Sequence, residues 1–380
     1  MKTLKDFNFT NKRVLVRCDF NVPISAEGDI LDDFRLQSAL PTIQFLIQSG
    51  AKIILMSHLE MKEKVISLKA ILSALEGLLG KKIKFLPNCF GENVKKEVEM
   101  MKAGNVILLE NLRFYKEEKE ADPKFAKEIS QLGDFYINEA FSCSHRAHAS
   151  IVGIPKYLPS AAGFLLEKEI KTLSQILERP KRPLIAIIGG IKIETKIKTI
   201  LNFLEKADHL LLGSKIGEVI LAQKMILIGR QIAEEKLIEK IKLTDPKLHL
   251  PFDGRISLRE GTESYFRIGG VGTLKKEEEI FDVGPETIKI FVEIIKKGRT
   301  IFWSGPLGMF EKKEFEAGTK EIAEAITRNY SAFKVAGGGD TISAINKFEL
   351  AQKFDFLSTG GGAMLEFLAG EKLPGIEALK

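Results

Sequence analysis

Short apolar runs alternate with longer stretches of helical periodicity along almost the whole chain. Such alternation is typical of parallel sheets covered by helices on both faces, because strands buried on both sides read as continuous apolar segments. Nine runs qualify as strands, four in the first half and five in the second: residues 14–20, 52–58, 106–112, 134–140, 184–190, 209–214, 300–305, 333–339 and 354–362. We therefore predict an α/β fold with two doubly wound, Rossmann-like parallel-sheet domains.

One long helix is predicted between the two sets of strands. Its apolar residues recur at helical spacing, and we expect Ser160 to act as the N-cap and Pro180 to stop it. We predict an N-terminal domain over residues 1–155, an interdomain helix and hinge over 156–180, and a C-terminal domain over 181–370.

Composition narrows the class of protein without deciding its function. A length of 380 residues suits two domains, and the formal charge of +6 is mild for this size. Basic residues are scattered among acidic ones, so neither nucleic-acid binding nor membrane insertion is expected. Three widely spaced cysteines predict buried thiols rather than a disulfide framework or metal site. The N-terminus lacks an apolar signal region, and we expect a cytoplasmic location.

Polar residues follow the predicted strands, where ligands bind in open parallel sheets. In the first half these are Asp19 and Asn21, His58, Arg113, and the group His145, Arg146 and His148, with Arg35 in a nearby loop. Guanidinium groups bind phosphate and carboxylate bidentately, so this rim suits a small substrate carrying both. The alternative is that these cations pair with local surface acids.

Glycines instead follow the strands of the second half, at 189–190, 213, 337–339 and 360–362. Glycine lets backbone N–H groups approach an anion, which predicts a nucleotide phosphate site, although such turns also serve packing alone. Lys192 and Lys196 follow the first pair at a spacing that would place both on one helix face. Asp340 and Thr341 follow the third group, where a carboxylate could hold magnesium.

Common nucleotide and hydrolase fingerprints do not occur in the chain: it contains no GxxxxGK[ST], complete GxGxxG, HExxH or GxSxG pattern. A P-loop ATPase, a dinucleotide dehydrogenase, a zinc protease and a serine hydrolase therefore lose support. An anion rim and a glycine-rich rim separated by a hinge favour phosphoryl transfer between two bound ligands.

The chain closely resembles the phosphoglycerate kinase family along essentially its full length. The resemblance rests on the order and spacing of VRCDFNVP (16–23), DDFRLQSALPTI (32–43), ENLRF (110–114), NEAFSCSHRAHAS (138–150), AIIGGIKIETKI (186–197), FDVGPETI (281–288), WSGPLGMFE (303–311), AGGGDT (336–341) and STGGGAMLEFLAG (358–370). It implies a bilobal, monomeric enzyme moving a phosphoryl group from 1,3-bisphosphoglycerate to magnesium-ADP, giving 3-phosphoglycerate and ATP. It also implies that residues 371–380 return to the first lobe.

The resemblance assigns the triose to the first lobe. It implies that Arg35 stabilises charge on the transferring phosphoryl group. The other implied triose contacts are Asp19 and Asn21, which would also secure Arg35, together with Phe20, His58, Arg113 and Arg146, whereas His148 is expected to be structural.

The resemblance assigns the nucleotide to the second lobe. It implies that Lys192 contacts the migrating phosphoryl group, that Lys196 contacts nucleotide phosphates, and that Asp340 binds Mg²⁺. Glu311 would accept hydrogen bonds from the ribose, unless it is merely a solvated charge beside Lys312. The remaining implied positions are Gly213, Gly338, Gly339 and Thr341 around the nucleotide, with Gly338 and Gly361 near the moving group.

Several positions depart from the family pattern. Glu60, Met61 and Lys62 replace the family's Gly-Arg-Pro, so we expect weaker triose binding, with Lys62 as a point charge in place of an arginine fork. Other departures are Glu139 and Ser142 in NEAFS, Ser304 in WSGP, Thr195, and the segment GSKIGEVIL (213–221). Two rival interpretations remain: a binding or regulatory descendant without turnover, and a different doubly wound kinase or dehydrogenase.

Overall fold

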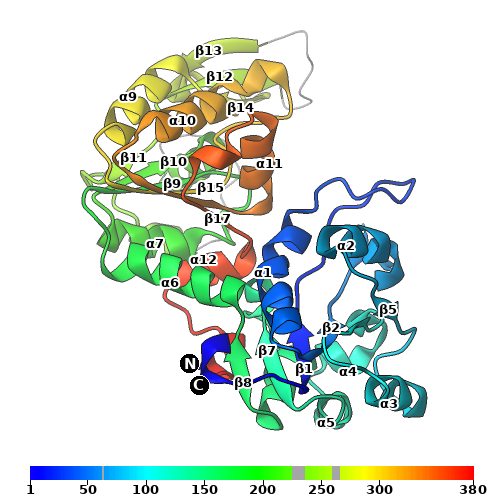
Figure 1. The fold of residues 1–380 in the computed structure, drawn as a ribbon. Helices are drawn as coiled ribbons and strands as arrows, with labels where there is room; N and C mark the ends of the chain where they lie inside the picture. Colours follow the sequence, from blue (N-terminus) through cyan, green and yellow to red (C-terminus); the bar gives the residue numbers. More distant parts are fainter. Residues whose placement is uncertain (62–63, 225–235, 259–265) are drawn as a thin grey trace. The chain divides into compact units, whose positions relative to one another are not determined.

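The computed structural model describes residues 1–61, 64–224, 236–258 and 266–380. These form two compact units, one comprising Met1–Lys171 and Lys372–Lys380 and the other Thr172–Glu371 (Figure 1). The chain therefore crosses between the units twice.

The first unit is built on a six-stranded parallel sheet in the order β5-β6-β2-β1-β7-β8. Its strands are β1 (Arg13–Arg17), β2 (Lys52–Met56), β5 (Lys84–Phe85), β6 (Val106–Leu108), β7 (Phe135–Asn138) and β8 (Ser160–Ala162). Its helices are α1 (Phe34–Gln48), α2 (Leu72–Leu79), α3 (Glu92–Glu99), α4 (Lys116–Lys119), α5 (Pro123–Ser130) and α13 (Pro374–Glu377). A short hairpin of β3 (Glu60–Met61) and β4 (Lys64–Val65) follows β2.

The second unit has a six-stranded parallel sheet in the order β11-β10-β9-β15-β16-β17. Its strands are β9 (Leu184–Ile188), β10 (His209–Leu212), β11 (Leu248–His249), β15 (Thr300–Ser304), β16 (Phe333–Gly337) and β17 (Phe356–Ser358). Counted along the chain this order is 3-2-1-4-5-6, in which ligands bind where the winding direction reverses, here between β9 and β15.

Helices cover both faces of this second sheet, with α9 and α10 on one side and α7 and α12 on the other (Figure 1). The helices are α7 (Ile197–Lys206), α8 (Ser214–Gln223), α9 (Pro285–Ile295), α10 (Ala317–Arg328), α11 (Gly339–Lys347) and α12 (Gly362–Leu368). The predicted doubly wound α/β fold is confirmed, and all nine predicted strands occur in the two parallel sheets.

A three-stranded antiparallel sheet in the second unit was not predicted. It consists of β12 (Asp253–Leu258), β13 (Phe266–Gly270) and β14 (Glu278–Val283), paired in the order β13-β12-β14. The residues of β13 are exposed or only partly buried, and charged residues open β14, so neither segment reads as a buried apolar run.

Two predictions of helix boundaries were wrong. Ser160 does not cap the long helix, because Ser160–Ala162 forms β8 and pairs with β7; the helix, α6, spans Phe164–Glu178. Lys192 and Lys196 do not share a helix face, because α7 begins at Ile197 and both lysines precede it. Pro285, within the matched segment FDVGPETI, is the first residue of α9, a position that its fixed φ favours.

All three cysteines are free and buried, as predicted. No helix in the described ranges has both the length and the apolar character needed to span a bilayer. Lys62, proposed above as a substitute cation, lies outside the described residues.

Candidate functional site

Asp19 lies just beyond the carboxyl end of β1 and organises the polar residues there. Its carboxylate pairs with Arg35 Nη1 at 2.8 Å, accepts a hydrogen bond from Ser142 Oγ, and accepts another from the Asn21 backbone N–H at 3.1 Å. Burial disfavours the charged form, but the Arg35 charge and the hydrogen bonds from Ser142 and Asn21 outweigh that effect and lower the pKa of Asp19 to about 2. Asp19 is therefore ionised and holds Arg35.

Arg35 is fixed from two directions by this arrangement. Besides Asp19, its Nη1 donates to the backbone oxygen of Asn21 at 3.0 Å, while the side chain stays 32% exposed. The alternative pairing with Asp32 or Asp33 is not the one observed: Asp33 accepts a hydrogen bond from Gln37 instead. The guanidinium is thus oriented yet accessible.

His58 follows β2 and is held in its neutral form. Burial, together with Arg17, Arg113 and Arg146, keeps its pKa well below the usual range, although Asp19 opposes them. Arg17, at the end of β1, was missed by the sequence analysis. It is buried, lies 3.4 Å from His58 Nδ1 and donates from Nε to Ser150 at 2.9 Å. An arginine inside an otherwise apolar strand was the available signal.

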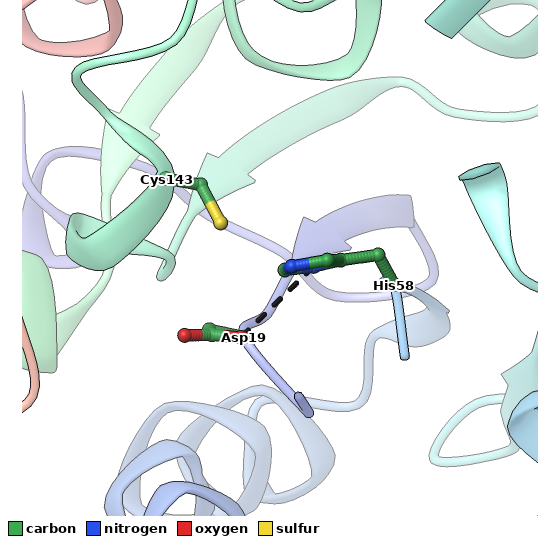
Figure 2. A group of neighbouring side chains, drawn as sticks. All are labelled: Asp19, His58 and Cys143. Carbon is green, nitrogen blue, oxygen red and sulfur yellow. Dashed lines mark ion pairs between the residues drawn. The ribbon is translucent and has the colours of Figure 1, made fainter. Parts of the chain in front are cut away.

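Asp19, His58 and Cys143 bring possible metal-ligand atoms within 4.8 Å of one another (Figure 2). The surroundings do not suit a cation. Asp19 already pairs with Arg35, and burial raises the pKa of the Cys143 thiol, which keeps it protonated. The same cationic surroundings favour an anion.

The remaining predicted triose residues lie in the same unit with different exposures. Arg113 is buried and pairs with Glu60, whereas Arg146 is exposed and donates to His145 at 3.3 Å. Phe20 is buried, and its backbone N–H donates to Ser57 Oγ at 2.8 Å. His148 lies 3.9 Å from the Glu118 carboxylate, and its pKa falls to about 4, first because of burial.

In the second unit, the carboxyl ends of β9 and β15 approach each other closely. A Cβ on Gly189 would lie 2.0 Å from the backbone oxygen of Pro306, so only glycine fits there. The Lys196 ammonium sits at this junction, donating to the backbone oxygens of Gly189 and, at 3.5 Å, Ser304. Burial lowers the pKa of Lys196 to about 8, with Asp340 partly opposing it.

A pocket of about 460 Å³ opens beside this junction. Among the residues predicted for the nucleotide site, Gly190, Glu311 and Asp340 line it. Several other lining residues had no predicted role and come mainly from β14, α8 and the loop after β15: Lys215, Glu279, Ile280, Phe281, Leu307, Gly308 and Met309. The residues from β14 were missed because that strand was not predicted, whereas Lys215 belongs to the atypical segment 213–221.

The other predicted nucleotide residues surround the strand ends. Gly338, at φ +102°, and Gly361, at φ +50°, directly precede α11 and α12, and Gly339 begins α11. Thr341 is buried and accepts a hydrogen bond from the Gly305 N–H at 2.6 Å. A Cβ on Gly213 would lie 2.9 Å from the Cα of Gly189, so the backbones approach closely there. Lys192 is exposed in the loop after β9.

A sequence profile described as phosphoglycerate kinase matches residues 4–371. The chain belongs to the phosphoglycerate kinase family. Membership confirms the predicted family and the predicted class of enzyme, a phosphotransferase.

Curated relatives in the phosphoglycerate kinase family match the chain from end to end. The phosphoglycerate kinase of Coprothermobacter proteolyticus is 41% identical over 390 residues, covering 100% of this chain and 98% of its own. That of Dictyoglomus turgidum is 43% identical over 387 residues, covering 99% and 98%.

Solved structures agree with the sequence relatives. The phosphoglycerate kinase of Pyrococcus horikoshii superimposes with a TM-score of 0.88 at 34% identity, covering 100% of this chain and 98% of its own. That of Coxiella burnetii gives a TM-score of 0.84 at 35% identity, with 99% and 98% coverage.

Proposed function

We propose that the chain transfers a phosphoryl group reversibly between 1,3-bisphosphoglycerate and ADP, giving 3-phosphoglycerate and ATP. The main support for this proposal is Arg35, which is fixed by the Asp19 carboxylate and the Asn21 backbone and remains partly exposed. A preoriented cation is what charge developing on a transferring phosphoryl group requires. The identity of the two substrates is inferred from membership of the phosphoglycerate kinase family.

The triose site consists of the cationic end of the first sheet. Arg113 and Arg146 bind the non-transferring phosphate and the carboxylate, while Asn21 and neutral His58 supply hydrogen bonds. Because His58 is buried with a strongly lowered pKa, it stays neutral and leaves the positive charge to the arginines. Phe20 shapes the apolar floor through its buried ring.

The nucleotide site is the pocket beside β9 and β15, whose volume of about 460 Å³ suits a nucleoside portion. Glu311 accepts from the ribose hydroxyls, and the backbone around Gly338, Gly339 and Thr341 together with Lys196 binds phosphates. Gly213 permits the close approach of α8 to the strand ends.

Asp340 is suited to bind Mg²⁺ together with nucleotide phosphates. Its carboxylate lines the pocket and lies in the first turn of α11, and magnesium proteins often supply only one or two carboxylates besides phosphate oxygens. Bound Mg²⁺ neutralises charge on the phosphate oxygens during transfer.

The transfer is direct and in line, without a covalent enzyme intermediate. Arg35, Lys192 and the backbone preceding α12 at Gly361 stabilise the equatorial oxygens of the moving group. The two sites belong to different compact units, so transfer requires the units to bring their ligands together and exclude water, with α6 as the hinge element. We expect the enzyme to act as a cytoplasmic monomer.

A coupled turnover assay with 3-phosphoglycerate, ATP and Mg²⁺ tests the proposal. We expect Arg35→Ala to lower kcat by at least about 100-fold while ATP affinity is retained, because the lost contact acts mainly in the transition state. Arg13→Ala, which removes an arginine paired with Asp134 away from the site, is the control and should leave kcat unchanged. A folded wild-type protein without turnover would favour the non-catalytic descendant.

A further inference from the structure

Glu60 places a negative charge directly against a cation of the triose site. Its Oε2 pairs with Nη1 of Arg113, and its Oε1 lies 3.8 Å from Nζ of Lys119. The Arg113 side chain is 4% exposed and the Glu60 side chain 25%. The Glu60 carboxylate, which is the more accessible partner, therefore pairs with a buried guanidinium.

The backbone of Glu60 is anchored, so this contact is built into the fold. The Glu60 N–H donates to Oδ1 of Asn21 at 2.8 Å, and Glu60 pairs with Val65 in the hairpin. The preceding carbonyl, of Leu59, accepts from the buried Asn111 side chain at 2.7 Å. These bonds hold Glu60 on the side of Arg113.

Arg113 keeps an unused donor despite its burial. Its Nε is buried without a hydrogen-bond partner among the described residues, while its backbone N–H is held by Asn111 Oδ1 at 2.9 Å. A buried N–H normally has a partner, and a guanidinium binds an oxyanion best through two parallel N–H groups. The Nε without a partner, on a guanidinium whose Nη1 pairs with Glu60, points to an oxyanion ligand that competes with Glu60 for Arg113.

We propose that Glu60 is a specificity-determining residue, an internal competitor that a substrate anion must displace from Arg113. The inference rests on the proposed triose site. Displacing Glu60 costs the ion pair between Glu60 and Arg113. A ligand with both a phosphate and a carboxylate offsets this cost by pairing with additional cations such as Arg146. An ion with a single anionic group has fewer such contacts, so Glu60 discriminates most strongly against simple anions.

Isothermal titration of the full-length protein with 3-phosphoglycerate and, separately, with inorganic phosphate tests this role. We expect Glu60→Gln to lower the Kd for both ligands by about 10-fold or more, with the larger gain for inorganic phosphate, because a competing charge on a buried guanidinium is removed. In turnover, KM for 3-phosphoglycerate should fall with little change in kcat. Glu120→Gln, which removes an exposed charge near Lys119, should shift neither Kd by more than about 2-fold.

Unchanged or weaker binding by Glu60→Gln would overturn the inference, because Glu60 would then be positioning Arg113 rather than competing for it. Glu60→Asp keeps the charge but shortens its reach, so it should give an intermediate gain and serves as the test if the amide variant does not fold. Wild-type protein that neither binds nor converts 3-phosphoglycerate would refute the proposed function instead. The inorganic phosphate titration still decides the competition in that case.

Discussion

Lys196, a partly buried side chain in the proposed nucleotide site, would link phosphate binding to pH. Burial lowers its pKa to about 8, so the free protein loses this charge as the pH rises through that value. A bound phosphate favours the ammonium form and raises the pKa again. We therefore predict that affinity for Mg-ADP falls by about 10-fold between pH 7 and pH 9, with proton uptake on binding, measured by calorimetry in buffers of different ionisation enthalpy.

Lys196→Arg is the matched control, since a guanidinium stays charged throughout this range. The arginine variant should bind Mg-ADP with a flatter pH profile and less proton uptake. Equal pH slopes for both proteins would show that Lys196 is not the titrating group.

At the residue scale, the sequence could identify individual candidates but only some of their partners. The resemblance predicted that Asp19 and Asn21 secure Arg35, and both contacts are present, whereas local sequence alone left pairing with Asp32 or Asp33 open. Glu60 was recognised only as a departure. Its pairing with Arg113, 53 positions along the chain, arises from the β3–β4 hairpin and could not be read from local sequence.

At the element scale, Glu139 connects β7 to the start of α6. The Leu165 N–H donates to its two carboxylate oxygens at 3.1 and 3.2 Å, and a Cβ on Gly163 would lie 1.8 Å from Oε2. Burial raises the pKa of Glu139 to about 8, against about 4.3 in an unfolded chain. The folded state therefore binds more protons between these values, so this group's contribution to stability falls as the pH rises through that window.

Glu139→Gln removes this titration while keeping the shape and one acceptor oxygen. Relative to wild type, we expect the variant to gain roughly 1–3 kcal/mol in free energy of unfolding when the pH is raised from 5.5 to 8.5, measured by urea denaturation. Glu120→Gln, at an exposed residue, should show no such gain. A constant difference between Glu139→Gln and wild type across the range would contradict the raised pKa.

Elements with a strong apolar pattern were predictable, and those defined by tertiary pairing were not. The buried run at β9 matches a predicted strand, and Pro285 marks the start of α9. β8 was mistaken for the beginning of a helix because Ser160 resembles an N-cap, whereas pairing with β7 determines its conformation. The antiparallel sheet was missed for the same reason, and with it the part of the pocket formed by β14.

At the scale of the whole molecule, the chain leaves the first unit within α6 and re-enters it at Lys372. The returning segment forms α13, whose residues Leu373 and Ile376 are buried. The Gly375 N–H donates to the backbone oxygen of Ser144 at 2.8 Å, next to the segment that carries Ser142 and Arg146. The end of the chain therefore supports a loop of the proposed triose site.

Gly375 is the position at which this support can be tested. A Cβ there would lie 2.7 Å from Ile151 Cγ2 and 2.9 Å from the backbone Cα of Ser144. We expect Gly375→Val to destabilise the protein by about 1–3 kcal/mol and to raise the Kd for 3-phosphoglycerate several-fold, with little change for Mg-ATP, because the displaced loop belongs to the first unit. Lys380→Ala, at the exposed chain end, should change neither affinity. Equal losses of both affinities in titration calorimetry would show that the segment acts on the whole enzyme rather than on the triose site.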